Sequence, residues 1–238
     1  MISTNIDNEI KELNLDTQLK ELFSNAGIPV KYHFKTLTTD WSKLYSPSGA
    51  LTGLSKKRSE DVYNFVAAYM KAIPNIISGK PLKVKTPKAI HMVSDLIFDG
   101  SKSSGKTLLM SLIAQEAIKK GCKVAYIEWT EYSDRFMSFE QRSANEDYYN
   151  TCLESDFLFI DNFYNYETSY SKFFIMQFDR LITHRVNKGK ITVCSIDTVG
   201  SENPVLGFSW NKFSRETFTF KLPGTELNNE NKSKRTRA

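Results

Sequence analysis

The sequence lacks any apolar run approaching the ~20 residues that a helix needs to cross a bilayer, so it does not predict a membrane-spanning protein. Cysteine and histidine are also scarce, at three residues each. Cys122, Cys152 and Cys194 are widely spaced and form no Cys-x-x-Cys pair, and the histidines have no metal-ligand spacing. These shortages argue against a disulfide framework and a zinc site, and they favour buried free thiols.

No strong excess of one charge is present either, because 32 basic and 27 acidic residues leave a net charge of +5. This mild excess permits polyanion binding without demonstrating it. The 238 residues suffice for one α/β domain with a sizeable core and a short extension. The first residues, MISTNIDNEIKEL, are polar and partly acidic, which is typical of neither a secretory signal nor a transit peptide. We therefore expect an intracellular protein.

The amino-terminal quarter predicts two helices with a loop between them. Apolar residues recur at helical spacing from Leu15 to Phe23, and Gly27 and Pro29 end this first helix. Residues 46–58, SPSGALTGLSKKR, are rich in turn formers and bases and predict an exposed loop. A second helix is expected from Ser59 onward. The first helix either docks in a groove of a partner or packs on the protein's own core.

The rest of the chain alternates between strand and helix patterns, without an internal repeat. Short, nearly continuous apolar runs predict strands at residues 89–98, 123–129, 157–161, 191–196 and 218–222. Such strands, separated by helices, indicate a parallel sheet covered on both faces, the α/β class. We expect a helical extension over residues 1–45, the main domain over residues 46–225, and a basic, disordered tail over residues 226–238.

One segment of the main domain matches a complete motif, the phosphate-binding loop G-x-x-x-x-G-K-[ST]. It lies between an expected strand and an expected helix, as this motif requires. Its glycines let the backbone approach phosphate oxygens closely, and its N–H groups lie at the positive end of the helix. We therefore predict a P-loop NTPase that binds ATP through Gly100, Ser101, Lys102, Ser103, Ser104, Gly105, Lys106 and Thr107.

The chemistry of such a site assigns a role to individual side chains. Lys106 would reach the β- and γ-phosphates, and the Thr107 hydroxyl would join the shell of a Mg²⁺ ion. Asp161 ends the apolar strand FLFID, where an acid holds the same Mg²⁺ shell. Asp197 follows the strand ITVCSI, where it either senses the γ-phosphate or orients water, or is simply an exposed acid at a strand end. Arg215 precedes the last strand and either projects into the nucleotide site of a neighbouring subunit or forms a surface salt bridge with Glu216 or another acid.

Asn162 stands directly after Asp161, at a place where many ATPases carry a Glu or Asp that polarises the attacking water. An amide cannot take a proton. Three interpretations stay open: slow hydrolysis with ATP serving as a binding switch, a base supplied by Glu128 or Glu131, or water positioned by Asn162 itself. We expect ATP hydrolysis, with a slow rate.

Taken in chain order, these pieces resemble the DnaC/IstB-type AAA+ ATPases, which include bacterial and phage replicative-helicase loaders. The resemblance covers roughly residues 25–225. Its matching pieces are Gly27-Ile28-Pro29 with Tyr32 and Thr36-Leu37, the phosphate loop, DFLFID at 156–161, DRLITHRVNKGK at 179–190 leading into ITVCSID, and Ser214-Arg215 at the arginine-finger position. Two departures stand out: amide and acid are exchanged between Asn162 and Asp197, and fewer residues precede the GIP segment than in the family's loaders.

The resemblance implies a protein of DNA replication in the cytoplasm of a bacterium or a phage-infected cell. It implies ATP and Mg²⁺ as cofactors, a homo-oligomer with ATP at the subunit interfaces, single-stranded DNA and a replicative helicase as partners, and no membrane. The basic segments 56–58 and 232–237 are candidate DNA contacts. Two alternatives remain: a RecA-like recombinase or annealing ATPase, whose strand-end acid AYIEWTE at 125–131 would supply as Glu128 or Glu131, and an ATP-binding adaptor such as a transposition helper with little hydrolysis.

Overall fold

The computed structural model describes residues 15–37, 56–102, 104–135, 145–165, 172–197 and 207–222. Its centre is a sheet of five parallel strands: β3 (Leu96–Asp99), β4 (Val124–Glu128), β5 (Phe157–Asn165), β6 (Ile191–Asp197) and β7 (Phe218–Lys221). They lie in the order β4-β5-β6-β3-β7. The predicted α/β class with a parallel sheet is confirmed.

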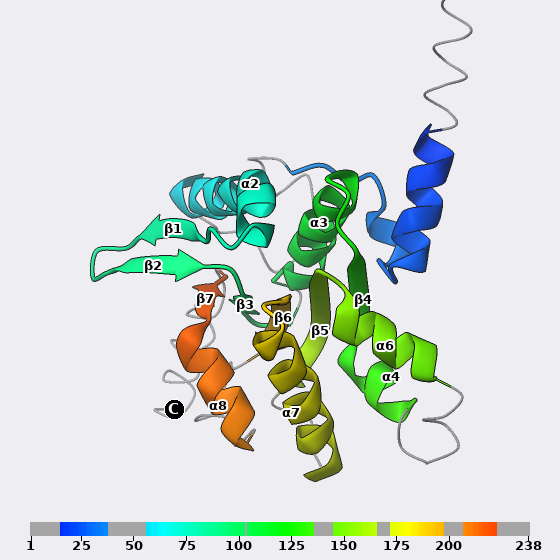
Figure 1. The fold of residues 1–238 in the computed structure, drawn as a ribbon. Helices are drawn as coiled ribbons and strands as arrows, with labels where there is room; N and C mark the ends of the chain where they lie inside the picture. The colour runs from blue at the N-terminus through cyan, green and yellow to red at the C-terminus, as the bar shows by residue number, and fades with distance from the viewer. Residues whose placement is uncertain are drawn as a thin grey trace, which may run out of the picture.

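Helices cover both faces of this sheet (Figure 1). On one side lie α2 (Lys56–Ile77) and α3 (Lys106–Lys119); on the other lie α4 (Trp129–Asp134), α6 (Glu146–Glu154), α7 (Lys172–Asn187) and α8 (Gly207–Glu216). Side chains alternate across each strand, so Phe98, Tyr126 and Phe159 pack in the α2–α3 layer while Ile97 and Ile127 pack in the other. Among the described residues, no helix is both long and apolar enough to span a membrane.

The described amino-terminal segment is packed onto this sheet. Residues 15–25 are helical, a short 3-10 helix η1 (Val30–Tyr32) follows, and Phe23 and Ile28 are buried in the core. The backbone N–H of Tyr126 donates to the Ala26 carbonyl at 2.7 Å. A Cβ on Gly27, whose φ is +85°, would lie 2.3 Å from the Tyr126 carbonyl oxygen. Phe23 thus packs on the protein's own core, although Leu15 and Leu22 of the same helix stay exposed.

The single strand predicted over residues 89–98 is wrong, because two strands occupy it. β2 (Ile90–Val93) pairs antiparallel with β1 (Leu82–Lys85), a strand that the sequence reasoning missed, and β3 joins the main sheet. The break falls at Ser94 and Asp95: the Ser94 carbonyl accepts a hydrogen bond from the Tyr69 hydroxyl, and the Asp95 carboxylate accepts one from the Thr192 N–H. These polar anchors redirect the chain between the two sheets.

Three other predicted boundaries are also wrong. The strand predicted over residues 123–129 stops at Glu128, because the Glu128 carboxylate accepts the Glu131 N–H and so begins α4 at Trp129. The strand predicted over residues 157–161 continues to Asn165. The loop predicted over residues 46–58 gives way to α2 at Lys56, and residues 46–55 lie outside the described residues, as does the predicted tail at 226–238. Helices α6 and α8 were not predicted.

The cysteines are free thiols: Cys152 and Cys194 are buried and Cys122 is half-buried. Burial raises the pKa of the Cys152 thiol to about 12, with a smaller opposing effect from Arg185. A thiol with so high a pKa is a poor nucleophile. These cysteines are therefore part of the packing.

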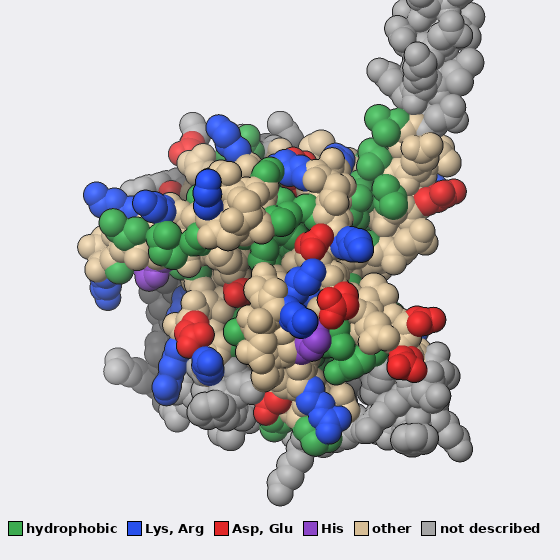
Figure 2. Space-filling model, in the orientation of Figure 1, with side chains coloured by type: hydrophobic (Ala, Val, Ile, Leu, Met, Phe, Trp, Pro, Cys, Tyr) green, Lys and Arg blue, Asp and Glu red, His purple; other side chains and the backbone are tan. Residues whose placement is uncertain are grey.

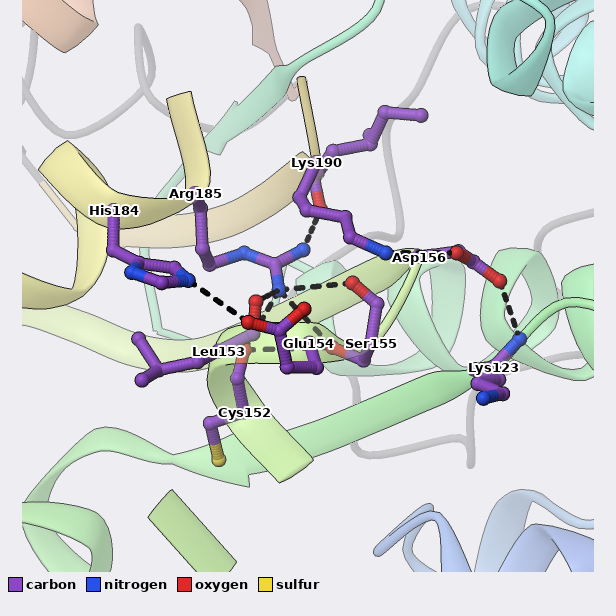
Figure 3. A network of polar contacts seen from close by, with 10 residues as sticks. Lys123, Cys152, Leu153, Glu154, Ser155, Asp156, His184, Arg185 and Lys190 are labelled. Carbon is purple, nitrogen blue, oxygen red and sulfur yellow. Dashed lines mark hydrogen bonds and ion pairs between the residues drawn. The ribbon is translucent and has the colours of Figure 1, made fainter. Parts of the chain in front are cut away.

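Arg185 joins three elements at the edge of the sheet where the strands begin, and its side chain is fully buried (Figure 3). Its Nε donates to Thr192 Oγ1 at 3.1 Å, one terminal nitrogen donates to the carbonyls of Cys152 (2.7 Å) and Ser155 (3.0 Å), and the other donates to the Ile191 carbonyl at 2.6 Å. Burial lowers the pKa of Arg185 to about 10, which leaves it a cation at neutral pH. It thereby ties the end of α6 to α7 and to the start of β6.

Candidate nucleotide-binding site

The predicted phosphate loop lies at the carboxyl end of β3 and leads directly into α3. The Gly100 N–H donates to the Ile196 carbonyl at 3.2 Å, which ties the start of the loop to β6. A Cβ on Gly100 would lie 2.5 Å from Ser104 Oγ, 3.1 Å from Leu222 Cβ and 3.2 Å from Ser104 Cβ, so a side chain there would crowd Ser104 and Leu222. Gly105 has φ +97° and immediately precedes α3. The backbone therefore favours glycine at Gly105, and the neighbouring side chains favour it at Gly100.

Lys106 is buried in the first turn of α3, with its ammonium inside the loop. Its Nζ donates to the carbonyl oxygens of Gly100 (2.5 Å) and Ser101 (2.9 Å). Burial lowers the pKa of Lys106, while the nearby Asp197, Asp161 and Asp99 oppose that shift. The structure thus brings Lys106 together with Asp161 and Asp197, the two acids that the sequence predicted for this site. Asp99 is a third nearby acid, which the sequence analysis did not predict.

The other loop residues surround this lysine. Ser101 and Thr107 are partly exposed, Lys102 is exposed and Ser104 is buried, while Ser103 lies outside the described residues. The Thr107 carbonyl accepts a hydrogen bond from Ser111 Oγ at 2.7 Å, which fixes the first turn of α3.

Asp161 is held by hydrogen bonds to both of its carboxylate oxygens. Oδ1 accepts from Ser195 Oγ at 2.5 Å and from the Asn162 N–H at 3.0 Å, and Oδ2 accepts from the Tyr126 hydroxyl at 3.1 Å. The carboxylate is only 4% exposed. Its orientation is therefore set from β4 on one side and β6 on the other.

Ser195 and Tyr126 are functional candidates that the sequence reasoning missed. Each stands two residues before an acid, Asp197 and Glu128 respectively, and so shares a sheet face with it. A hydroxyl in an otherwise apolar buried strand was the available signal, because buried polar groups find hydrogen-bond partners. Which partner they find depends on the strand order.

Asn162 occupies a bulge in β5. The register with β6 runs through Ile160 and resumes at Tyr164, and Ser195 faces the bulge and accepts the Asn162 N–H at 2.8 Å. Asn162 has φ +52°, in the left-handed region, and its side chain is exposed. Asn and Asp adopt this conformation far more readily than Glu does. The backbone itself therefore disfavours a Glu after Asp161.

This conformation makes a testable difference between substitutions at Asn162. We expect Asn162→Gly to leave the free energy of unfolding within about 0.5 kcal/mol of the wild type, and Asn162→Glu to lower it by about 1 kcal/mol. Urea denaturation measures both. Asn75→Glu, on the exposed surface of α2 with Lys71 one turn before it, is the control and should change little. Equal stability of Asn162→Glu and the control would contradict the argument.

Glu128 and Glu131, the two alternative bases, are placed differently. Glu128 pairs in register with Asp161 across β4 and β5, so both acids lie at the carboxyl edge of the sheet. Glu131 lies in α4, and its exposed carboxylate forms an ion pair with Arg135 at 2.6 Å. Of the two, Glu128 is therefore the one beside Asp161.

Arg215 is not brought to the loop of its own chain. It is exposed in the last turn of α8, just before β7. Phe218, the first residue of β7, pairs with Leu96, whereas the loop follows Asp99 at the other end of β3. Arg215 thus lies at the edge of the sheet where the strands begin, opposite the phosphate loop. Any contact with a nucleotide would have to be with that of another subunit.

The residues at the carboxyl edge fit a Mg²⁺–triphosphate. The loop from Gly100 to Gly105 leads into the amino terminus of α3, where backbone N–H groups and the positive end of the helix favour an anion. Asp161 and Thr107 offer hard oxygen donors, which Mg²⁺ prefers. Within the described residues, no cluster of three or more His, Cys, Asp or Glu could hold a metal ion alone. A metal here would need phosphate and water ligands, as Mg²⁺ commonly does.

This arrangement of sheet, loop and strand-end acid is the fold of the AAA+ P-loop NTPases. Among solved structures, the chain is similar to a DnaC helicase loader (TM-score 0.54, 16% identity, 82% of this chain and 99% of the loader). It is also similar to a DNA replication initiation factor (TM-score 0.53, 16% identity, 72% of this chain and 48% of that protein). A third similar structure is the replication initiator DnaA bound to AMPPCP and single-stranded DNA (TM-score 0.52, 17% identity, 68% of this chain and 45% of DnaA).

At these identities the likeness concerns the fold, and the chain spans slightly less than half the length of the two initiators. No protein-family model and no curated protein matches the sequence. The resemblance to DnaC-type AAA+ proteins that the sequence motifs indicated is thereby confirmed at the level of the fold.

Proposed function

We propose that this protein is an ATP-binding AAA+ protein that acts on single-stranded DNA in replication, as a loader of a replicative helicase. The observation that carries the proposal is the convergence of Lys106, Asp161 and Asp197 around one phosphate loop. The similarity in fold to a helicase loader and to DNA-bound and AMPPCP-bound DnaA supports the choice of nucleotide and of DNA.

In this proposal each side chain has a distinct task. Lys106 leaves the loop carbonyls and donates to the β- and γ-phosphates, while Asp161 and Thr107 hold Mg²⁺. Bound Mg²⁺ neutralises charge on the phosphates. Asp197 lies near the Lys106 ammonium and is placed to respond to the γ-phosphate. Asn162 positions water without taking its proton, which makes hydrolysis slow and favours a role for ATP as an assembly switch.

Arg215 provides the test of assembly. We expect Arg215→Ala to bind ATP with wild-type affinity, because its own loop is intact, and to lose ATP-dependent oligomers. Light scattering coupled to size-exclusion chromatography, with and without ATP and Mg²⁺, measures the assembly, and Lys212→Ala on the same helix is the control. If Arg215→Ala assembles like the wild type, the proposed place of Arg215 in the subunit interface is wrong.

A second candidate function rests on the pairing of Glu128 with Asp161. In a RecA-like recombinase or annealing ATPase, Glu128 would be the general base. We then expect Glu128→Gln to lower the ATPase rate by about two orders of magnitude or more, with Glu131→Gln as the control. A measurable rate unaffected by Glu128→Gln would rule out this base. Tight ATP binding without turnover would instead support a non-hydrolysing adaptor, such as a transposition helper.

The partner itself is identified by affinity capture from the host cell, with ATP and without it. Recovery of a replicative helicase, dependent on ATP and lost in Lys106→Ala, would support the loader assignment. Recovery of a transposase instead would overturn it.

A further inference from the structure

The net charge of the chain is concentrated in one acid-free stretch. Between Asp61 and Asp95 there is no acidic residue, and the stretch contains five lysines: Lys71, Lys80, Lys83, Lys85 and Lys88. This segment carries a charge of +5, which equals the net charge of the whole chain, so the remainder is neutral in sum. The mild excess of positive charge over the whole chain therefore arises from a strong local excess in this segment.

The structure places Lys83, Lys85 and Lys88 on the β1–β2 hairpin, Lys80 in the turn that leads from α2 into β1, and Lys71 on α2. All five are exposed, and none forms an ion pair within the described part of the chain. The hairpin extends from the body beside α2, and Lys and hydrophobic side chains gather over it (Figure 2). Within the described residues no acid neutralises these ammonium groups by an ion pair, and such a cationic surface attracts polyanions.

The two faces of the hairpin differ sharply. On the inner face, Val93 is buried, Leu82 and Val84 pack against the core, and the His91 ring contacts Phe218 at 5.1 Å between centroids. The outer face is formed by two cross-strand pairs, Lys83 with Met92 and Lys85 with Ile90. The inner face thus fixes the hairpin to the body, and the outer face is left to solvent.

Apolar side chains are unusually exposed on this outer face, with Ile90 at 67% and Met92 at 54%. Lysines alone would suffice to protect an exposed strand edge from aggregation. Two large apolar side chains lie directly opposite two lysines, so this face also offers an apolar surface beside the cations. In duplex DNA bound from the minor groove, Ile and Met are among the side chains that insert between base steps, which shows that such side chains can lie against base faces.

The turn of the hairpin is closed by hydrogen bonds between Thr86 and Ala89. The Thr86 N–H donates to the Ala89 carbonyl at 2.8 Å, and the Ala89 N–H donates back to Thr86 Oγ1 at 3.1 Å. Lys88 is therefore presented from a hydrogen-bonded turn, beyond the strands that carry Lys83 and Lys85. Such preorganisation lowers the entropic cost of binding.

We propose that the outer face of the β1–β2 hairpin, with Lys83, Lys85, Ile90 and Met92, binds single-stranded DNA. The lysines contact phosphates, and Ile90 and Met92 contact the faces of unstacked bases. This surface differs from the segments 56–58 and 232–237 that composition alone suggested. The inference rests on the proposed function, because it names the surface that would receive the DNA.

Salt-dependent binding of a fluorescein-labelled oligothymidylate tests the proposal on the full chain. We expect Lys83→Ala/Lys85→Ala to reduce the slope of log K against log[salt] by about 1.4 and to weaken binding about 20-fold near 0.1 M salt, since each phosphate contact in a single strand contributes about 0.7 to the slope. Ile90→Ser/Met92→Ser should weaken binding severalfold with the slope unchanged. Wild-type binding of a fluorescent ATP analogue verifies that each variant is folded.

Lys119→Ala/Lys188→Ala, at two exposed lysines outside the hairpin, is the control, and its slope should equal that of the wild type. If the wild type binds the oligonucleotide and the hairpin variants bind it equally well, the hairpin assignment is overturned while the proposed function stands. If a duplex of equal length binds as tightly and loses as much in both variants, the single-strand assignment is overturned. Failure of the wild type to bind DNA with or without ATP would overturn the proposed DNA function as well.

Discussion

Lys106→Ala should abolish ATP binding, with a loss of at least about 100-fold in affinity. The Lys106 ammonium is the only lysine or arginine group in the described loop that is buried, and it faces Asp197, Asp161 and Asp99. Each charge-assisted hydrogen bond to a phosphate contributes about 1.5–3 kcal/mol, so losing the bonds of Lys106 to both the β- and the γ-phosphate costs about 3 kcal/mol or more, which is about 100-fold in affinity. Titration with a fluorescent ATP analogue in the presence of Mg²⁺ measures the change.

Lys102→Ala is the matched control, because Lys102 belongs to the same loop but is exposed. Its affinity should stay within a few-fold of the wild type. A Lys106→Ala protein that is folded by circular dichroism and binds ATP as tightly as this control would refute the nucleotide site.

Arg185→Ala should lower the free energy of unfolding by about 3–5 kcal/mol. The substitution removes a buried cation and leaves the carbonyls of Cys152, Ser155 and Ile191 without this donor. A typical domain is stable by only about 5–15 kcal/mol, so this loss is a large fraction of the total. Arg185→Lys should recover little of it, since one ammonium cannot reach acceptors that the three guanidinium nitrogens contact separately. Urea denaturation measures these changes.

Arg180→Ala is the matched control for this prediction. Arg180 lies on the same helix, α7, but is exposed, so its removal should change the free energy of unfolding by no more than about 0.5 kcal/mol. Similar losses for Arg180→Ala and Arg185→Ala would mean that the buried hydrogen bonds contribute no more than an exposed side chain.

Lys106 could be found from the sequence, whereas the role of Arg185 is visible only in the structure. Lys106 belongs to a motif whose positions are all close in sequence, so a strand, a loop and a helix predicted its place. Arg185 looks like any helical arginine in the sequence DRLITHRVNKGK. Only the packing of α7 against the end of α6 reveals that it is buried (Figure 3).

For Asp161, the sequence predicts the position of the residue but not its hydrogen-bond partners. Its position at the end of an apolar strand was predictable, and the α/β order of strands and helices was too. The hydroxyls that hold its carboxylate come from β4 and β6, which lie 35 and 34 residues away. Such contacts follow from the strand order, which hydrophobic periodicity does not determine.

The sequence by itself determined the phosphate loop, the acid after FLFID and the parallel α/β class, because these depend on local backbone requirements and on the period of apolar residues. The tertiary structure decided what surrounds them. It bonded the Tyr126 and Ser195 hydroxyls to Asp161, put Asn162 in a bulge with a left-handed backbone, and left Arg215 at the opposite edge of the sheet. It also placed Lys83 and Lys85 on one face of a hairpin, opposite Met92 and Ile90. Each depends on which strands become neighbours, and that choice is made by burial of the whole core rather than by any local segment.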